Sequence, residues 1–219
     1  MAAGPLRAFI SYSSKDKKLA GDVKETMEDY GVETFLAHED IRPSAAWTTT
    51  IQTELRGCDV FLPLLTDNFS KSAWTDQETG MALALEKLIV PLRVDIVPYG
   101  FLGAIQAVHL KEDRPKTACR GVVSAIIEHR PTERERFLDG FIPKFANSGS
   151  FDEAGWYASV LVECDGYSTE HIQDVLRAIV ENRQIHDSRT ASDNVDKFIR
   201  KYGKADRGLA RKARRALAG

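Results

Sequence analysis

The 219-residue sequence lacks the features that mark secreted, disulfide-bonded and membrane-spanning proteins. It has only three cysteines, Cys58, Cys119 and Cys164, and they form no CxxC pair, so we expect reduced thiols and no disulfide framework. No apolar run approaches the roughly 20 residues that span a bilayer, and residues 1–6 are too short and uncharged to resemble a signal peptide. We therefore expect a cytoplasmic protein that does not bind membranes.

The sequence also lacks a large excess of charge of either sign, because it has 30 lysines and arginines and 32 aspartates and glutamates, for a net charge of -2. This balance excludes a uniformly basic nucleic-acid-binding protein. One local exception is the segment 204–219, which holds six basic residues and one acid. A solvated, frayed helix end accounts for such a run more readily than a binding site, so nucleic acid is not an expected partner. A sensor that binds nucleic acid through this tail stays open as an alternative hypothesis.

The common catalytic signatures are absent. There is no Walker loop and no GxGxxG, GxSxG or HExxH motif, and no histidine pair sits at metal-ligand spacing near a cysteine. A glycine-rich phosphate loop and a metal centre are therefore not expected. We predict neither a metal nor a bound cofactor.

The first 130 residues alternate short apolar runs with amphipathic segments. We predict strands at residues 7–12, 32–37, 59–65, 88–94 and 104–110. We predict helices at residues 15–30, 44–57, 74–87 and 117–129, and a short helical turn at 99–103. Pro63 suggests that the third strand ends early or bulges. The alternation predicts an α/β fold, with a flavodoxin-like five-stranded parallel sheet and helices on both faces. In such sheets ligands bind beyond the carboxyl ends of the strands.

The chain beyond residue 130 has the pattern of a small all-helical region. Apolar residues recur there at helical spacing, and Ser168 is placed to cap one helix. Ser192 or Asp193 is placed to cap another helix, which Gly203 ends. We predict a domain at residues 1–130, a helical domain of about four helices at 131–203, and a basic C-terminal tail at 204–219.

The most informative carboxylate lies in the segment SAWTDQE at residues 72–78. On a helix, Trp74 and Glu78 share a narrow stripe with three apolar residues further along, and Glu78 is the only acid in that stripe. A carboxylate among apolar neighbours is costly unless it is paired or solvated at a cleft. Spacing alone favours another interpretation, in which Thr75 and Glu78 form a capping box and Trp74 is a core residue.

The order of several short motifs along the chain favours a functional role for Glu78 over the capping box. FISY at 9–12 opens the first strand, and SSKD at 13–16 leads into the first helix. After the second strand come FLAHED at 35–40 and IRPS at 41–44. DNFSKS at 67–72 precedes the Trp74-x-x-x-Glu78 pair, and IVPL at 89–92 lies in the fourth strand. Over residues 6–130 the chain resembles a Toll/interleukin-1 receptor (TIR) domain, in the style of the prokaryotic members.

The resemblance implies an NAD+ nucleosidase or ADP-ribosyl cyclase, with NAD+ as a substrate. Many family members release nicotinamide and either ADP-ribose or a cyclic isomer of it, and their catalytic glutamate corresponds to Glu78. The residues that the resemblance places around the substrate are Phe9, Ser11, Ser13, Phe35, His38, Asp40 and Trp74. One carboxylate suffices, because nicotinamide leaves as a neutral pyridine and the oxocarbenium-like transition state needs only negative charge near the ribose.

The resemblance also implies partners. Family members associate with each other through their TIR domains, and some serve bacterial or archaeal anti-phage defence, in which a downstream effector binds the cyclic product. A second hypothesis stays open: a non-enzymatic adaptor for signal transduction in innate immunity, with the loop 41–46 as its protein-binding surface. Trp74 and Glu78 favour the enzyme, since an adaptor has no need of a carboxylate in that stripe.

Overall fold

The chain forms two units in the computed structural model, Met1–Glu133 and Arg134–Gly219. The structure describes residues 4–37, 47–111 and 113–218. The first unit ends three residues beyond the boundary expected at residue 130. Within the described residues, no helix is both long and apolar enough to cross a membrane.

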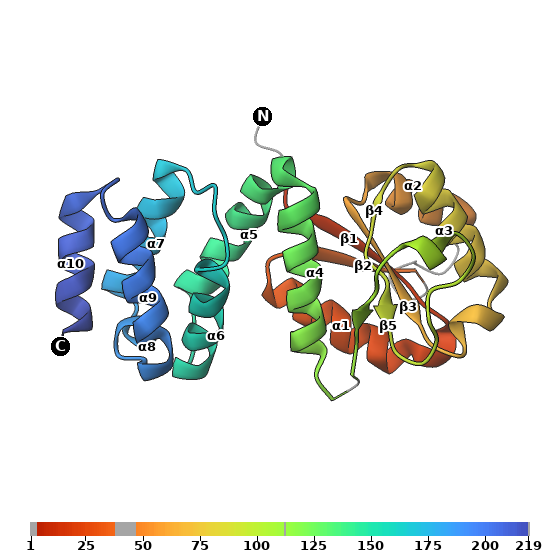
Figure 1. Ribbon diagram of the computed structural model, residues 1–219, viewed down its shortest axis with the longest axis horizontal. Helices are drawn as coiled ribbons and strands as arrows, with labels where there is room; N and C mark the ends of the chain where they lie inside the picture. The colour runs from red at the N-terminus through yellow and green to blue at the C-terminus, as the bar shows by residue number, and fades with distance from the viewer. Residues whose placement is uncertain (1–3, 38–46, 112, 219) are drawn as a thin grey trace. The chain divides into compact units, whose positions relative to one another are not determined.

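The first unit is built on a parallel sheet (Figure 1). Its strands are β1 (Arg7–Ser11), β2 (Glu33–Leu36), β3 (Val60–Leu65), β4 (Leu88–Ile89), β5 (Leu92–Arg93) and β6 (Val108–His109). They are ordered β2-β1-β3-β5-β6, and β4 also pairs with β3. Because β4 and β5 share one position beside β3, the predicted five-stranded parallel fold is confirmed with its fourth strand interrupted.

Two prolines explain the interruption. The expected strand 88–94 breaks at Val90 and Pro91, because proline has no N–H to donate to a ladder. Strand β3 changes its partner strand beside this break: Phe61 of β3 pairs with Ile89 of β4, and Leu64 of β3 pairs with Leu92 of β5. Pro63 lies between these two ladders, where no donor is needed from it. The strand therefore runs through Pro63, and the expected early end or bulge there is wrong.

Helices cover both faces of this sheet. They are α1 (Lys17–Asp29), α2 (Trp47–Gly57), α3 (Ala73–Ala84) and α4 (Pro115–His129), joined by the 3-10 turns η1 (Ser14–Asp16), η2 (Phe69–Lys71), η3 (Gly100–Ala104) and η4 (Pro131–Glu133). Figure 1 shows α1 and α4 on one face and α2 and α3 on the other. The expected last strand, 104–110, shortens to β6 because η3 runs through Ala104 and Ile105 closes it. All six residues of β3 are buried, as a strand covered on both faces requires.

The face of the sheet under α2 and α3 carries one apolar cluster. Phe9 of β1 and Phe61 of β3 pack there with Leu55 of α2 and Ala82 of α3, and all four are fully buried. Successive side chains of a strand alternate between faces, so Ser11 lies on the same face as Phe9. The polar end of β1 is thereby directed at α2 and α3.

The second unit is helical. The described residues form α5 (Arg134–Ala146), α6 (Phe151–Leu161), α7 (Thr169–Glu181), α8 (Arg183–His186), α9 (Arg189–Tyr202) and α10 (Arg207–Leu217). Five of these, α5 to α9, lie in the region 131–203 where about four were expected, and α10 lies in the segment expected as a tail. The Ser168 cap is confirmed, since its Oγ accepts the His171 N–H at 3.1 Å. The cap expected at Ser192 or Asp193 is wrong: Ser188 Oγ accepts the Ala191 N–H at 3.1 Å and starts α9 earlier.

The basic segment expected as a separate tail is part of this second unit. Asp206 caps α10, accepting the Leu209 N–H at 2.9 Å, and also accepts a bond of 3.2 Å from Gln173 on α7. Ala210 and Ala213 are buried, and α10 packs on α7 and α9. The frayed helix end expected from the charge run is therefore wrong, because a side-chain cap and two buried alanines fix the helix.

Candidate functional site

The candidate site lies where β1 ends against helix α3. Glu78 stands in the middle of α3 with 2 % of its surface exposed, and Ser11, the last residue of β1, is fully buried. The Ser11 hydroxyl donates a hydrogen bond of 2.5 Å to Glu78 Oε2. The two residues are 67 positions apart in the chain, and the fold brings them into direct contact.

The inward orientation of Glu78 follows from the face that α3 buries. Its buried residues are Thr75, Glu78, Thr79 and Ala82, at the spacing of one helix face. Thr75 fixes the start of the helix, since its hydroxyl lies 2.8 Å from the Phe69 carbonyl oxygen and 2.7 Å from that of Ser72. The capping-box interpretation is therefore wrong: the Thr75 hydroxyl bonds these carbonyls, and Glu78 bonds Ser11.

Burial dominates the electrostatics of Glu78. It raises the pKa of the carboxyl from 4.5 to about 7, and the hydrogen bond from Ser11 opposes part of that rise. The second oxygen, Oε1, is buried and has no hydrogen-bond partner among the residues that the structure describes. Near pH 7 the carboxyl therefore exists in both protonation states, and one of its two oxygens forms no hydrogen bond with the described residues.

Aromatic side chains lie beneath this pair. The Phe9 ring is 5.3 Å from the Phe35 ring and 5.8 Å from the Phe61 ring, which gives a row across three neighbouring strands. Phe9 is fully buried and Phe35 is half-buried. Ser13 follows β1 at the start of η1 with 7 % of its surface exposed. Of the expected substrate-binding residues, Phe9 belongs to the core, whereas Ser13 and Phe35 lie closer to the surface.

Trp74 is placed differently from a core residue. It is 41 % exposed, so the core interpretation is wrong. It precedes Glu78 by one helical turn, and residues four apart lie on the same side of a helix. The structure thus puts an exposed indole one helical turn before the buried carboxylate. His38 and Asp40, the remaining expected site residues, lie outside the described residues.

One polar group near this edge of the sheet was missed by the sequence analysis. The Asp16 carboxylate accepts a hydrogen bond of 2.6 Å from Thr66 Oγ1 and one of 2.8 Å from Asn68 Nδ2. These bonds tie the turn after β1 to the loop after β3. The signal was present in the sequence, since the motifs SSKD and DNFSKS follow strands whose carboxyl ends meet at one edge.

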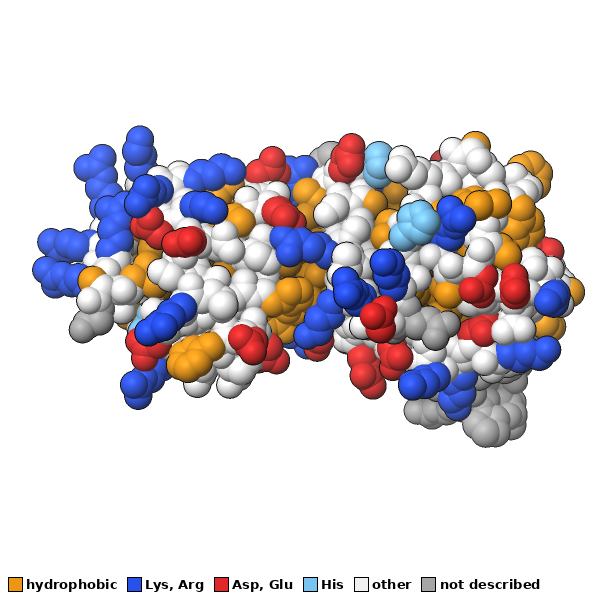
Figure 2. All heavy atoms as spheres, turned by 60° about the horizontal axis from the view of Figure 1, so that its bottom comes forward, with side chains coloured by type: hydrophobic (Ala, Val, Ile, Leu, Met, Phe, Trp, Pro, Cys, Tyr) orange, Lys and Arg blue, Asp and Glu red, His pale blue; other side chains and the backbone are white. Residues whose placement is uncertain are grey.

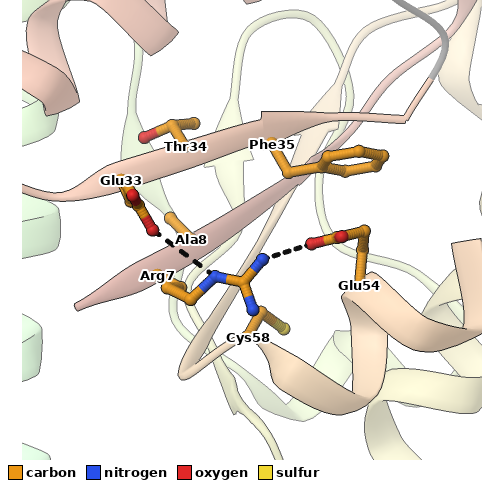
Figure 3. Close-up of a pocket in the computed structure, with 7 residues that line it drawn as sticks. All are labelled: Arg7, Ala8, Glu33, Thr34, Phe35, Glu54 and Cys58. Atoms are coloured by element: carbon orange, nitrogen blue, oxygen red, sulfur yellow. Dashed lines mark hydrogen bonds and ion pairs between the residues drawn. The ribbon is translucent and has the colours of Figure 1, made fainter. Parts of the chain in front are cut away.

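A different cavity, of about 350 Å³, opens near the start of β1 (Figure 3). It is lined by Arg7, Ala8, Glu33, Thr34, Phe35, Glu54 and Cys58. Arg7 Nη2 lies 2.5 Å from Glu54 Oε2, and Arg7 Nε lies 3.6 Å from Glu33 Oε2. Because these two carboxylates outweigh the guanidinium, the cavity does not suit a phosphate. Arg7 and Ser11 stand at opposite ends of β1, about 13 Å apart, so this cavity is distinct from the Glu78 site.

The described residues contain no group of three or more histidine, cysteine or acidic side chains arranged to hold a metal ion.

The family model described as "TIR domain" matches residues 8–123, which is more than half of the chain. The chain belongs to the TIR domain family. Its TIR domain is similar to the crystal structure of the TIR domain of the Toll-related receptor TRR-2 from Hydra magnipapillata, with 20% identity and a TM-score of 0.47, over 55% of this chain and 97% of that one. The chain is also similar to the TIR domains of the activated Roq1 resistosome that recognises the pathogen effector XopQ, with 15% identity and a TM-score of 0.40, over 72% of this chain and 98% of that one. No curated protein matches.

Proposed function

We propose that this TIR domain cleaves NAD+ between nicotinamide and ribose, with Glu78 as its catalytic residue. The observation that carries the proposal is a buried carboxylate at the carboxyl end of a parallel strand, with one oxygen bonded to Ser11 and the other without a partner in the described residues. Burying such a group costs stability, and acids with perturbed pKa values cluster at functional sites. The TIR family includes NAD+-cleaving enzymes as well as adaptors.

The proposed reaction needs a single carboxylate. When the bond between C1′ and the pyridinium nitrogen breaks, its electron pair leaves with neutral nicotinamide and the ribose becomes oxocarbenium-like. Ionised Glu78 stabilises that positive charge. Water then adds to C1′ and releases a proton, which gives ADP-ribose; attack by an adenine or ribose atom of the same molecule gives a cyclic isomer. The positive charge of bound NAD+ favours the ionised form of Glu78.

The neighbouring residues take supporting roles in this proposal. Ser11 holds the Glu78 carboxylate in one orientation, and Ser13 and the exposed Trp74 border the substrate. Phe35 and the buried Phe9 shape the apolar floor beneath it. Contacts of His38 and Asp40 with the substrate stay predictions.

TIR domains self-associate, and the first unit offers an apolar surface suited to that. Its exposed large apolar side chains among the described residues are Trp74, Val97 and Phe101, the last 84% exposed. The hydroxyl of Tyr99 donates a bond of 2.8 Å to Asp76 Oδ1, which ties this segment to α3. We propose that this surface contributes to contacts between copies of the domain.

The activity is tested by incubating concentrated protein with NAD+ and following nicotinamide release by chromatography. We expect release by the native protein, and loss of at least about 100-fold in Glu78→Gln, the size of a missing electrostatic contact to a transition state. Glu25→Gln, the same change at an exposed position of α1, is the control and should keep full activity. No release at any concentration, or equal release by both variants, would refute the proposal and leave the adaptor hypothesis. The same chromatogram distinguishes ADP-ribose from a cyclic isomer.

Self-association is tested through the dependence of specific activity on protein concentration. Phe101→Ser should require a higher concentration to reach the native rate, whereas Phe151→Ser, which changes an exposed phenylalanine of the second unit, should not. Equal behaviour of the two variants would contradict the proposed surface. The anti-phage role and the effector for a cyclic product stay predictions, and phage challenge of cells carrying native protein or Glu78→Gln tests the first of them.

A further inference from the structure

The second unit carries a basic groove between helices α9 and α10. Its hollow, of about 450 Å³, is lined by Ile199, Arg200, Gly203, Lys204, Arg207, Ala210, Arg211 and Arg214. Figure 2 shows lysine and arginine side chains gathered at the end of the second unit that α10 forms. The floor of the groove is apolar and its rim is cationic.

The packing of α10 directs its charges outward. Ala210 and Ala213 are buried against the unit, so the opposite face of the helix is exposed. Arg207, Arg211 and Arg214 are exposed and follow one another at the spacing of one helix face. The helix rise places the ends of this row about 10 Å apart. The result is an ordered row of three guanidinium groups beside an open groove.

These charges are not neutralised within the protein. Arg200 pairs with Asp196 at 2.6 Å, but Lys204 and the three arginines of α10 form no ion pair with any residue that the structure describes. Asp206, the one acid in 204–219, is engaged as the cap of α10. Like charges one helical turn apart repel each other, so an anion in the groove would relieve that repulsion.

The chemistry of the groove favours a phosphate backbone as that anion. Arginine forks bind phosphate oxygens in a bidentate manner, and a nucleic acid presents such groups at regular intervals. A helix that lies on a lipid surface needs large apolar side chains beside its charges, whereas the groove offers only Ile199, Gly203 and Ala210. With no aromatic side chain among the lining residues, the groove cannot stack single-stranded bases in the usual way.

We propose that this groove binds the phosphate backbone of a nucleic-acid duplex without reading its sequence. This revises the expectation that nucleic acid is not a partner, which assumed a frayed helix end. An ordered α10 holds its arginines in one row, so several phosphates can be contacted together. The proposal does not depend on NAD+ cleavage, and Glu78→Gln should bind nucleic acid like the native protein.

The test measures fluorescence anisotropy of labelled duplex DNA, duplex RNA and single-stranded DNA with the full chain at different salt concentrations. About four phosphate contacts predict that log K falls against log salt with a slope of about -3.6, or about 100-fold weaker binding between about 50 and 200 mM salt. We expect the double variant Arg207→Gln/Arg211→Gln to reduce that slope by about 2 and to weaken binding by at least about tenfold.

The matched control is Lys144→Gln/Arg189→Gln, which removes the same charge from exposed positions outside the groove and should change the affinity by less than about twofold. Circular dichroism checks that both variants are folded, and the salt slope of the native protein is a readout that requires no variant. No salt-dependent binding to either duplex, an equal loss in both double variants, tighter binding to single strands, or binding to phosphatidylserine vesicles in place of duplex would each overturn the proposal.

Discussion

Replacing Glu78 by glutamine should stabilise the first unit at alkaline pH and change its stability little in acid. Burial raises the pKa of this carboxyl from 4.5 to about 7 in the native state. Because the native pKa is the higher one, the native state keeps its proton at a pH where the unfolded chain has lost it. The stability associated with that proton is fully present below about pH 4.5 and is lost as pH rises through about 7. The gap corresponds to about 3 kcal/mol.

The assay compares urea unfolding of the two proteins between about pH 4.5 and pH 8. A Trp156→Phe background leaves Trp47 and Trp74 as the only tryptophans, and both belong to the first unit, so fluorescence reports on that unit alone. The advantage of Glu78→Gln in unfolding free energy should grow by about 3 kcal/mol over this range. Glu25→Gln, at an exposed position, should show no such growth.

Two results would refute this reasoning. A difference between the native protein and Glu78→Gln that does not vary with pH would mean that Glu78 titrates alike in the native and unfolded states. An advantage that shrinks with rising pH would mean that the native fold stabilises the ionised form, as a cation close to Glu78 would.

Three further predictions concern activity and packing. The kcat/KM for nicotinamide release, which reports on the free enzyme, should rise with pH through about 7, since ionised Glu78 is the proposed active form, and a kcat/KM profile that is flat across this range would contradict that role. Ser11→Ala should move this midpoint upward, because the hydrogen bond that it removes lowers the pKa of Glu78, and should cost about 1.5–3 kcal/mol at pH 8 in the same urea assay. Gly155→Ala should destabilise the second unit by about 1–3 kcal/mol, since its Cβ would meet the Thr190 hydroxyl, whereas Gly208→Ala on exposed α10 should stabilise it by about 0.5–1 kcal/mol; Trp156 fluorescence in a Trp47→Phe/Trp74→Phe background measures both.

The parallel sheet was predictable from the sequence because its strands are buried on both faces. A strand such as Val60–Leu65 is then a nearly continuous apolar run, a sequence pattern that few other elements share. The division of the fourth strand was harder to foresee, since it depends on how Pro63 and Pro91 come to lie side by side in neighbouring strands. Their alignment is set by the register of β3 against its partner strands, and no local sequence pattern carries information about that register.

The candidate site was predictable only in part, and for a similar reason. Glu78 stood out as the single acid in an apolar stripe, but local spacing paired it with Thr75. In the fold, Thr75 bonds carbonyls before α3 and Glu78 bonds Ser11 from a distant strand. A local motif thus competes with hydrogen-bond partners from distant parts of the chain, and local sequence spacing does not reveal those partners. The cap of α10 at Asp206 was a local signal, and the charges around it obscured it.

The buried thiols give each unit a chemical reporter of its opening. Burial raises the pKa of Cys58 to about 11 and those of Cys119 and Cys164 to about 12, so all three are protonated and unreactive at neutral pH while they remain buried. A thiol reagent can therefore label them only when the surrounding structure opens. Cys58 and Cys119 report on the first unit and Cys164 on the second. We expect NAD+ to slow the labelling of Cys58 and Cys119, and duplex nucleic acid to slow the labelling of Cys164 alone. This pattern would show which unit binds each ligand without any substitution in the chain.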